Sequence, residues 1–339
     1  MNGRISIIFM ITDYCNCKCF FCSRNNLSQH YNNPKLDDCC RVFETLSHAY
    51  PSSKLVISGG EPTLSEDFFA ILNYVTPLFE KVEIQTNGTF NKEIANQLKP
   101  LLSKNIYLQF SLDGGLEKHD SIRGHGIFKK VIENIQYLQE YHTHLSISTT
   151  VTPSNIEDII SLARYLNNFQ FRRLTVSYVQ PLNPIEERIL SAYQWNQFVD
   201  DLLAQCFYRV DVSKLYDFNL MEKFLNSGKE WHGIVNCGRG ITHFYVTPSF
   251  DVLPCTCTDY KVGNLLTDSI LDIKQKLAAK ETIRIDSASV CRDCKYLTIC
   301  NGGCPGLSLK VFGSENMGDI RCPKVFEFAT KKGLLYQHD

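Results

Sequence analysis

The chain of 339 residues has little net charge and no long apolar run. Its 35 Lys and Arg residues are offset by 36 Asp and Glu residues, which gives a formal net charge of -1. This balance, without any long run of Lys or Arg, argues against nucleic acid or an anionic membrane as a partner. No apolar stretch approaches the roughly 20 residues that a membrane span needs, and the N-terminus lacks a small-residue cleavage site. We therefore expect a cytoplasmic protein.

The 15 cysteines fall below the density of a disulfide-rich scaffold. In a reducing compartment they would remain thiolates that can bind metal. A hydrophobic content of 44% is ample for the core of a large α/β domain and a smaller second domain. Metal binding is therefore favoured over disulfide bonding.

Three of these cysteines have the spacing C-x3-C-x2-C near the N-terminus. Residues Ile5 to Ile11 alternate in hydrophobicity, which predicts a strand, and Cys15, Cys19 and Cys22 follow it in one short loop. A cluster of four irons is normally held by four thiolates, so three local ligands leave one iron free to bind another molecule. The alternative is a zinc site completed by a ligand from elsewhere in the chain.

Short β-rich runs alternate with helical patterns along the first half of the chain. The expected strands are Ile5 to Ile11, Leu55 to Ser58, Lys81 to Thr86, Ile106 to Ser111, Leu145 to Val151 and Leu174 to Val179. The expected helices lie near Cys39 to Tyr50 and at Phe68 to Leu78, Lys92 to Leu102, Phe128 to Tyr141 and Ile156 to Leu166. About six βα units predict an α/β fold, a partial (β/α)6 barrel of the TIM type, with its chemistry at the strand ends.

Cysteines return near the C-terminus with regular spacing. The pattern C-x2-C-x5-C-x3-C-x17-C is formed by Cys291, Cys294, Cys300, Cys304 and Cys322, and it is preceded by Cys237, Cys255 and Cys257. Chance placement of five cysteines so regularly is improbable, and a pair of zinc knuckles is the alternative to iron-sulfur clusters. Helices are expected before this region, at Tyr193 to Tyr208 and Phe218 to Leu225. We divide the chain into a barrel at 1-182, a helical bridge at 183-232 and a cysteine-rich domain at 233-339.

The N-terminal cysteine loop resembles that of the radical S-adenosylmethionine (SAM) enzymes, in which an aromatic residue, here Phe21, precedes the third cysteine. Cys17 is not part of that pattern. The tetrapeptide Gly59-Gly60-Glu61-Pro62 is similar to the GGEP motif that holds the amino group of SAM. Residues 119-128 resemble the HD-x-x-RG-x-G-x-F segment of peptide-modifying members. The resemblance covers the chain from about Ile5 to Cys322.

The resemblance implies a [4Fe-4S] cluster on Cys15, Cys19 and Cys22 with SAM bound beside it. The implied SAM contacts are Phe21, Gly59, Gly60, Glu61, Pro62, Thr86, Asn87, Ser111, Asp113, Arg123 and Val151. The guanidinium fork of Arg123 suits the SAM carboxylate, although a surface ion pair with Asp120 is the alternative. Asn87 is weighed evenly between a SAM contact and a turn former.

The C-terminal cysteines resemble the SPASM extension of these enzymes, which holds two auxiliary [4Fe-4S] clusters. By that resemblance the outer cluster is held by Cys291, Cys294, Cys300 and Cys322, and the inner one by Cys237, Cys255 and Cys304. The fourth inner ligand stays open among Cys257, Cys206 and an iron left free for substrate. A β-hairpin is expected at Phe244 to Pro254. Because Phe250 stands where the family usually has Gly, we expect its turn to differ.

The implied activity is an oxidoreductase reaction on a ribosomally made peptide. A 5'-deoxyadenosyl radical would abstract hydrogen, giving a thioether or carbon-carbon cross-link or an epimerised residue. The alternatives are a small-molecule dehydrogenase of the aminoglycoside kind and sulfatase-maturase-like protein oxidation. Formylglycine formation fits poorly, because Thr256 stands where those enzymes have Asp. A non-catalytic electron carrier is disfavoured by the SAM motifs.

The expected partners are the peptide and an external electron donor of the flavodoxin or ferredoxin type. Since the first strand starts near Ile5, we expect no N-terminal leader-binding domain. A peptide would then bind the barrel and SPASM surfaces, tested first at the aromatic-rich bridge from Tyr193 to Trp231, or be presented by a separate leader-binding protein.

Overall fold

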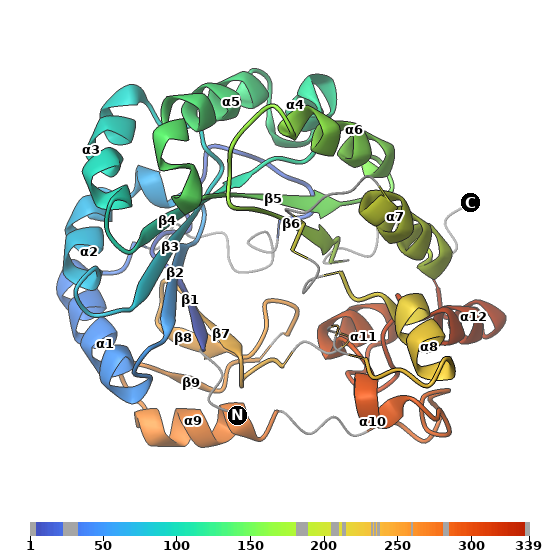
Figure 1. The fold of residues 1–339 in the computed structure, drawn as a ribbon. Helices are drawn as coiled ribbons and strands as arrows, with labels where there is room; N and C mark the ends of the chain where they lie inside the picture. Colours follow the sequence, from blue (N-terminus) through green and yellow to red (C-terminus); the bar gives the residue numbers. More distant parts are fainter. Residues whose placement is uncertain are drawn as a thin grey trace.

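The computed structural model describes residues 5-22, 33-180, 189-204, 210-211, 215-231, 233, 235, 238-258, 260-280 and 285-335. Cys206 and Cys237, both named above as ligand candidates, lie outside these residues. Within the described part, one nine-stranded sheet has the order β6-β5-β4-β3-β2-β1-β7-β8-β9 (Figure 1). The division into a barrel, a bridge and a cysteine-rich domain stays a prediction.

The six predicted strands of the barrel are confirmed, each to within a residue at either end. They are β1 (Ser6–Met10), β2 (Lys54–Ser58), β3 (Lys81–Thr86), β4 (Ile106–Ser111), β5 (Leu145–Val151) and β6 (Arg173–Tyr178). Each pairs in parallel with the next. Their apolar side chains, such as those of Ile7 and Phe9, are fully buried, as expected for strands covered on both faces.

Helices cover the outer face of this sheet, and Figure 1 shows them as an arc around it. They are α1 (Leu36–Ala49), α2 (Phe68–Val75), α3 (Lys92–Leu102), α4 (Leu116–Arg123), α5 (Ile127–Tyr137) and α6 (Ile156–Leu166). The predicted helix at Phe128 to Tyr141 is too long, since α5 ends at Tyr137 and a 3-10 helix, Gln139–His144, follows. Helix α4 has no counterpart among the predicted helices because only His119 and Ile122 of its side chains are buried.

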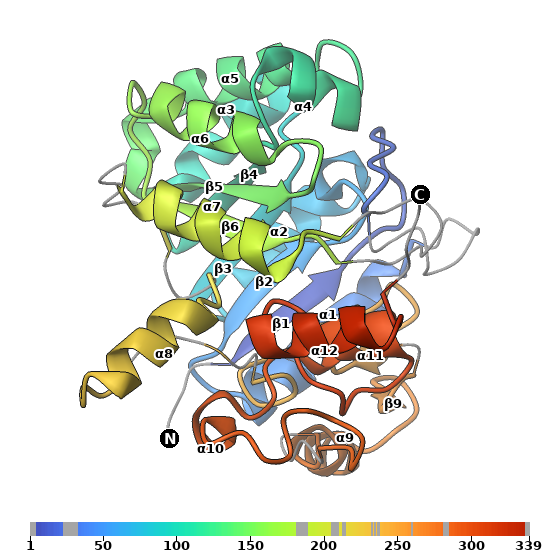
Figure 2. The same ribbon diagram turned by 90° about the vertical axis from the view of Figure 1, so that its right-hand side faces the viewer.

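The remaining described residues form the elements that follow β6 in the chain (Figure 2). They are α7 (Ala192–Ala204), α8 (Phe218–Asn226), β7 (His243–Val246), β8 (Asp251–Leu253), β9 (Gly263–Asn264), α9 (Ile270–Ala278), α10 (Leu297–Cys300), α11 (Pro305–Phe312) and α12 (Pro323–Lys331). Among the described residues, no helix combines the length and apolar character that a bilayer span requires.

The cysteine-rich region shares the sheet of the barrel. Strand β7 pairs in parallel with β1, and β7 and β8 form the predicted antiparallel hairpin. At its turn Phe250 has a left-handed φ of +63°. Glycine adopts this conformation without strain, whereas a residue with a side chain does not. Phe250 is buried and its ring lies edge-on to Phe9 at 6.0 Å, a contact that offsets the strain.

Charged side chains cross the interior of the barrel at the amino ends of the strands. Glu83 on β3 is almost fully buried and pairs with Lys54 on β2 at 2.8 Å and with Arg173 on β6 at 3.4 Å. Strands β3 and β6 are separated by two others in the sheet. Neighbouring strands lie about 4.8 Å apart, so this contact requires the sheet to curve strongly.

We predict that Glu83→Gln lowers the free energy of unfolding by about 2–3 kcal/mol. This loss is somewhat smaller than that from breaking a fully buried ion pair, because the cationic partners of Glu83 keep part of their hydration. Burial raises the pKa of Glu83, but Lys54 and Arg173 outweigh it and hold the pKa below its ordinary value of 4.5. The stabilisation is therefore present above that pH and is lost as the pH falls through the folded-state pKa.

Urea unfolding from pH 7 to pH 3 measures this effect. The control is Glu133→Gln, which removes an exposed helical pair with Lys129 at 3.9 Å and should cost less than about 0.5 kcal/mol. Equal losses in the two variants would show that the pairs across the barrel contribute nothing special.

Candidate active site

A cavity of about 310 Å³ lies at the carboxyl ends of the parallel strands. Its volume is at the lower end of the roughly 300–1,000 Å³ typical of small-molecule sites. Of the residues predicted from the sequence, it is lined by Cys15, Cys19, Cys22, Phe21, Gly59, Gly60, Thr86, Asn87, Ser111 and Arg123. The three predicted thiols, a fourth from Cys17 and one guanidinium therefore share a single cavity, which fits an iron-sulfur cluster with an anionic group bound beside it.

Four other predicted contacts lie behind the cavity wall: Glu61, Pro62, Asp113 and Val151. The side chain of Val151 belongs to the apolar core. Glu61 and Asp113 are fully buried and bound to protein groups. Their roles as SAM contacts stay predictions, and the geometry gives both carboxylates a positioning role.

The Glu61 carboxylate ties the GGEP loop to the end of β3. It accepts hydrogen bonds from the backbone N–H and hydroxyl of Thr63, from Thr86 Oγ1 at 2.7 Å and from the N–H of Asn87 at 2.6 Å. Burial raises the pKa of Glu61, and the bonds from Thr63 and Asn87 oppose that rise. These donors keep the loop after β2 and the loop after β3 in a fixed relation.

The two glycines before Glu61 contact the backbone of the loop that carries Cys15, Cys19 and Cys22, which we call the cluster loop. Gly60 N–H donates to Thr12 O and Glu61 N–H donates to Tyr14 O, both at 2.7 Å. A Cβ at Gly59 would lie 2.3 Å from Thr12 O, and one at Gly60 would lie 1.9 Å from Tyr14 O. Only glycine therefore allows this close approach of the two backbones.

Asn87 acts as a turn former and also contacts the loop of Cys15, Cys19 and Cys22, while its role as a SAM contact stays a prediction. Its Oδ1 accepts from the N–H and hydroxyl of Thr89, which forms the turn after β3. Its Nδ2 donates to Asn16 Oδ1 at 2.7 Å and lies 3.3 Å from Cys17 Sγ. Asn87 thus joins the turn after β3 to the cluster loop.

The HD-x-x-RG segment holds the loop after β4. Arg123 Nε donates to Asp113 Oδ2 at 2.5 Å, and His119 Nδ1 accepts from Asp113 N–H at 3.0 Å. Asp120 accepts from the N–H groups of Gly126 and Phe128 instead. The alternative of an ion pair between Arg123 and Asp120 is therefore wrong.

The Arg123 guanidinium is paired with the buried Asp113 and is the one cationic group of this segment that lines the cavity. Burial, with the nearby charge of Arg123, lowers the pKa of His119 to about 4, so the imidazole is neutral at pH 7. Asp113 accepts from Nε of Arg123. The Arg123 side chain also lines the cavity, and its Cζ lies 5.9 Å from the centre of the Phe21 ring. Arg123 is thus held at the point where a carboxylate could bind.

Sequence reasoning missed several cavity residues: Cys17, Ser58, Gln85, Thr150, Ser177, Tyr178 and Gln180. Most belong to an uncharged polar lining, in which Ser58 donates to Gln85 and Thr150 lies opposite Ser177. The alternation of side chains along β5 could have identified Thr150 as a cavity residue, since successive side chains of a strand point to opposite faces. It predicts that Thr150 faces the interior if Val151 is core.

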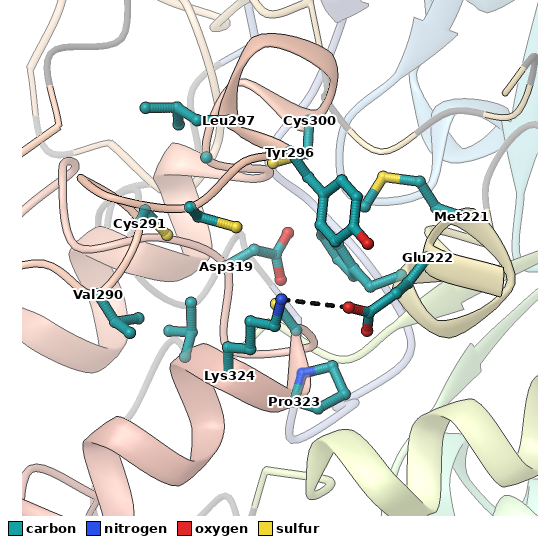
Figure 3. Close-up of a pocket in the computed structure, with 15 residues that line it drawn as sticks. Met221, Glu222, Val290, Cys291, Tyr296, Leu297, Cys300, Asp319, Pro323 and Lys324 are labelled. Carbon is teal, nitrogen blue, oxygen red and sulfur yellow. Dashed lines mark hydrogen bonds and ion pairs between the residues drawn. The ribbon is translucent and has the colours of Figure 1, made fainter. Parts of the chain in front are cut away.

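The four cysteines expected for the outer auxiliary cluster lie together. Cys291, Cys294, Cys300 and Cys322 line one pocket of about 40 Å³, and Figure 3 shows Cys291 and Cys300 beside Asp319 there. Burial raises the pKa of Cys291 to about 11 and that of Cys322 to about 12. Without metal these thiols would be protonated at neutral pH, and binding a metal would release the protons.

Two cysteines expected for the inner cluster lie near the barrel cavity. Cys255 is buried, and Cys304 is the N-cap of α11. Thr256, next to Cys255, has its hydroxyl 3.4 Å from the amide oxygen of Gln180, a cavity residue. Cys255 is therefore followed directly by Thr256, whose side chain contacts the cavity wall at Gln180.

The described cysteines are free thiols, and no three His, Cys, Asp or Glu side chains of the described residues gather tightly enough for a single metal ion. A partial parallel barrel with a cavity of this composition, followed by a cysteine-rich region, defines an iron-sulfur enzyme class. The sequence matches two family models, the radical SAM superfamily over residues 9–166 and the iron-sulfur cluster-binding SPASM domain over residues 237–295. The chain therefore carries a radical SAM domain and an iron-sulfur cluster-binding SPASM domain.

Similar proteins support the same assignment. Mycofactocin maturase MftC of Mycobacterium ulcerans is 27% identical over 321 residues, covering 90% of this chain and 84% of the relative. The subtilosin biosynthesis protein AlbA of Bacillus subtilis is 23% identical, covering 91% of this chain and 69% of the relative. The fold matches that of Streptococcus suis SuiB bound to its precursor peptide SuiA, with a TM-score of 0.73 at 21% identity, covering 95% of this chain and 76% of SuiB.

We predict that Gly60→Ala reduces iron binding by the cluster loop, because its Cβ would displace the Tyr14 carbonyl. Iron should fall by about four per chain relative to the wild-type protein, the content of one cluster. Gly115→Ala is the matched control, since a Cβ there meets nothing within 4 Å. Iron analysis after anaerobic reconstitution measures both, and equal iron in the two variants would contradict the proposed seating of the loop.

Proposed function

We propose that the chain modifies a ribosomally made peptide by radical SAM chemistry, using three [4Fe-4S] clusters. The observation that carries the proposal is the cavity itself, which joins the thiols of the cluster loop to the positive charge of Arg123 and to a polar lining near the auxiliary cysteines. When bound, the first cluster supplies the electron that splits SAM into methionine and a 5'-deoxyadenosyl radical, which takes a hydrogen atom from substrate.

The residues of this chain would bind and orient the reactants. Cys15, Cys19 and Cys22 would hold the first cluster, and Arg123 would bind the SAM carboxylate through its guanidinium. Gly59 and Gly60 would present backbone carbonyls to the amino group, while Glu61 keeps them in place through its bonds to the end of β3. Ser111, at the cavity wall, is suited to the SAM ribose.

The auxiliary cysteines suit a reaction in which the substrate is oxidised. Hydrogen abstraction leaves a substrate radical, and forming a thioether or carbon-carbon cross-link removes one further electron and one proton from the substrate. Cys255, which precedes Thr256 at the cavity wall, and Cys304 would hold the inner cluster, and its chemistry would be to accept that electron. Cys291, Cys294, Cys300 and Cys322 would hold the outer cluster, which would supply a route to an external acceptor. A donor of the flavodoxin or ferredoxin type would supply the electron that starts each turnover.

The cavity lining favours an uncharged group at the reacting position. Arg123 is the one basic side chain among the described cavity residues, and the SAM carboxylate would pair with it. Serine, threonine and glutamine side chains from Ser111, Thr150 and Gln85 provide hydrogen bonds instead. A peptide fits this lining, and the names of the relatives above support it.

Two other substrate classes are kept as alternatives: a small alcohol or amino sugar, and a sulfatase-like protein. The polar lining would also accept a sugar hydroxyl. Thr256 is hydrogen bonded to Gln180 instead of supplying the carboxylate expected of a sulfatase maturase, which disfavours that reaction.

We predict that replacing Cys15, Cys19 and Cys22 by Ala abolishes production of 5'-deoxyadenosine from SAM, because no cluster forms. Replacing Cys291 and Cys294 by Ala should leave some uncoupled cleavage and remove about four irons per chain. Chromatography of the nucleoside product under dithionite reduction measures both. Cleavage at the wild-type rate in the triple variant would refute the proposal.

A candidate precursor peptide encoded beside the gene tests the substrate class. Mass spectrometry should show loss of two hydrogens for a cross-link, or uptake of deuterium without such loss for epimerisation in D2O. Hydrogen exchange should show protection at the bridge, including α7 and α8, or in the SPASM region. Turnover of an amino sugar with no peptide binding would replace this substrate assignment, while leaving the radical chemistry intact.

A further inference from the structure

Four cationic side chains meet at the amino ends of the barrel strands, away from the cavity at the carboxyl ends. Lys54 and Lys81 are the first residues of β2 and β3 and are paired in register. Arg173 is the first residue of β6, and Arg172 directly precedes it. We call these four residues the amino-end cations. The radical chemistry proposed at the other ends of the strands makes no use of them.

Two carboxylates neutralise only part of this charge. Glu83 Oε1 accepts from Lys54 Nζ at 2.8 Å, and its Oε2 lies 3.5 Å from Arg172 and 3.4 Å from Arg173. Asp211 pairs with Arg173 at 3.0 Å. In the part of the chain that the structure describes, no third carboxylate forms an ion pair with these cations. The amino-end cations therefore carry more positive charge than their partners neutralise.

Lys81 has an aromatic ring as its neighbour instead of a carboxylate. Its Nζ lies 3.9 Å from the centre of the Tyr107 ring, and Arg172 Cζ lies 5.2 Å from the same centre. Burial and the charge of Arg172 lower the pKa of Lys81 to about 8. The ring of His144 lies 4.6 Å from that of Tyr107, and burial lowers the pKa of His144, so it adds no charge at pH 7. An anion beside Lys81 would relieve this cost.

The two arginines also lack acceptors. The Nε atoms of Arg172 and Arg173 are buried and have no hydrogen-bond partner among the described residues. Arg172 donates through a terminal nitrogen to Ser146 Oγ at 3.1 Å, a neutral acceptor. The side chains of Arg172 and Arg173 are 29% and 28% exposed, so a small solute can reach part of each. A guanidinium in this setting is suited to a multiply charged oxyanion.

We propose that the amino-end cations bind a phosphate group, with Lys81 and Arg172 as its principal ligands. A phosphate supplies the acceptor oxygens that the arginines lack and close to two negative charges at neutral pH. A chloride ion or a single carboxylate supplies fewer acceptors and only one charge. This binding site is independent of the radical chemistry, because it lies at the other end of the strands.

A bound phosphate would stabilise the barrel at the end where its charges cross the interior. Glu83 already joins β2 and β3 to β6 there, but it leaves Lys81 without an anionic partner. The same chemistry is offered by inorganic phosphate and by a phosphate carried on an organic molecule. Titrations with inorganic phosphate and with ribose 5-phosphate separate these two sources, since tighter binding of the sugar phosphate would identify a carried phosphate.

Isothermal titration calorimetry of the full reconstituted chain with inorganic phosphate tests the site, in chloride buffer of constant ionic strength. We expect saturable binding of a single phosphate. Lys81→Met and Arg172→Met should each weaken it by about tenfold or more, because each removes a charge-assisted hydrogen bond. Lys129→Met is the matched control, since it removes an exposed cation of α5 that pairs with Glu133, and it should bind phosphate as the wild type does.

Urea unfolding separates binding from a purely structural role. In chloride, Lys81→Met should unfold at a urea concentration no lower than the wild type, because it removes a half-buried cation that has no carboxylate partner. Saturating phosphate should raise the midpoint of the wild type and leave that of Lys81→Met nearly unchanged. Equal phosphate-induced shifts in the two proteins would overturn the proposal. The absence of phosphate binding to the wild type beyond that of chloride would overturn it too.

Discussion

The backbone contact between the cluster loop and the GGEP loop is the constraint on which the site depends. Two hydrogen bonds of 2.7 Å, from Gly60 to Thr12 and from Glu61 to Tyr14, join the segment after β1 to the segment after β2. Neither glycine tolerates a Cβ at this distance. A cysteine loop with no regular secondary structure of its own is thereby positioned by two rigid strands, as a cluster with only three local ligands requires.

Buried charges extend this positioning around the cavity. Glu61 joins the loops after β2 and β3, while Asp113 and Arg123 join the loop after β4 to the C-terminal end of α4. Each carboxylate is desolvated, and each has donors that offset that cost. Since neither lines the cavity, their effect on SAM would pass through the backbone and through Arg123. The motif residues thus divide into those that contact the cavity and those that hold them there.

Much of this could be predicted from the sequence, because strand periodicity and cysteine spacing are local signals. The bounds of β3, β4 and β5 follow from runs of β-branched and aromatic residues, and six parallel strands follow from their alternation with helices. The partner of Arg123 could not be predicted, since Asp113 lies ten residues away and is brought close only by the loop after β4. The sequence also could not show that the Val151 side chain faces the apolar core, because this depends on how the strand is placed in the sheet.

The continuous sheet connects the two metal-binding regions mechanically. Strand β1 leads into the cluster loop and also pairs with β7, whose hairpin leads to Cys255. On the other side of the opening, Gln180 after β6 contacts Thr256, so the loop of Cys255 and Cys257 is held from both edges of the barrel. The buried Asp319 then accepts from Cys304 N–H and from Arg321 while lining the outer pocket. Through these contacts the first cluster loop, the inner cysteines and the outer cysteines are fixed relative to one another, as the proposed electron transfer between clusters would require.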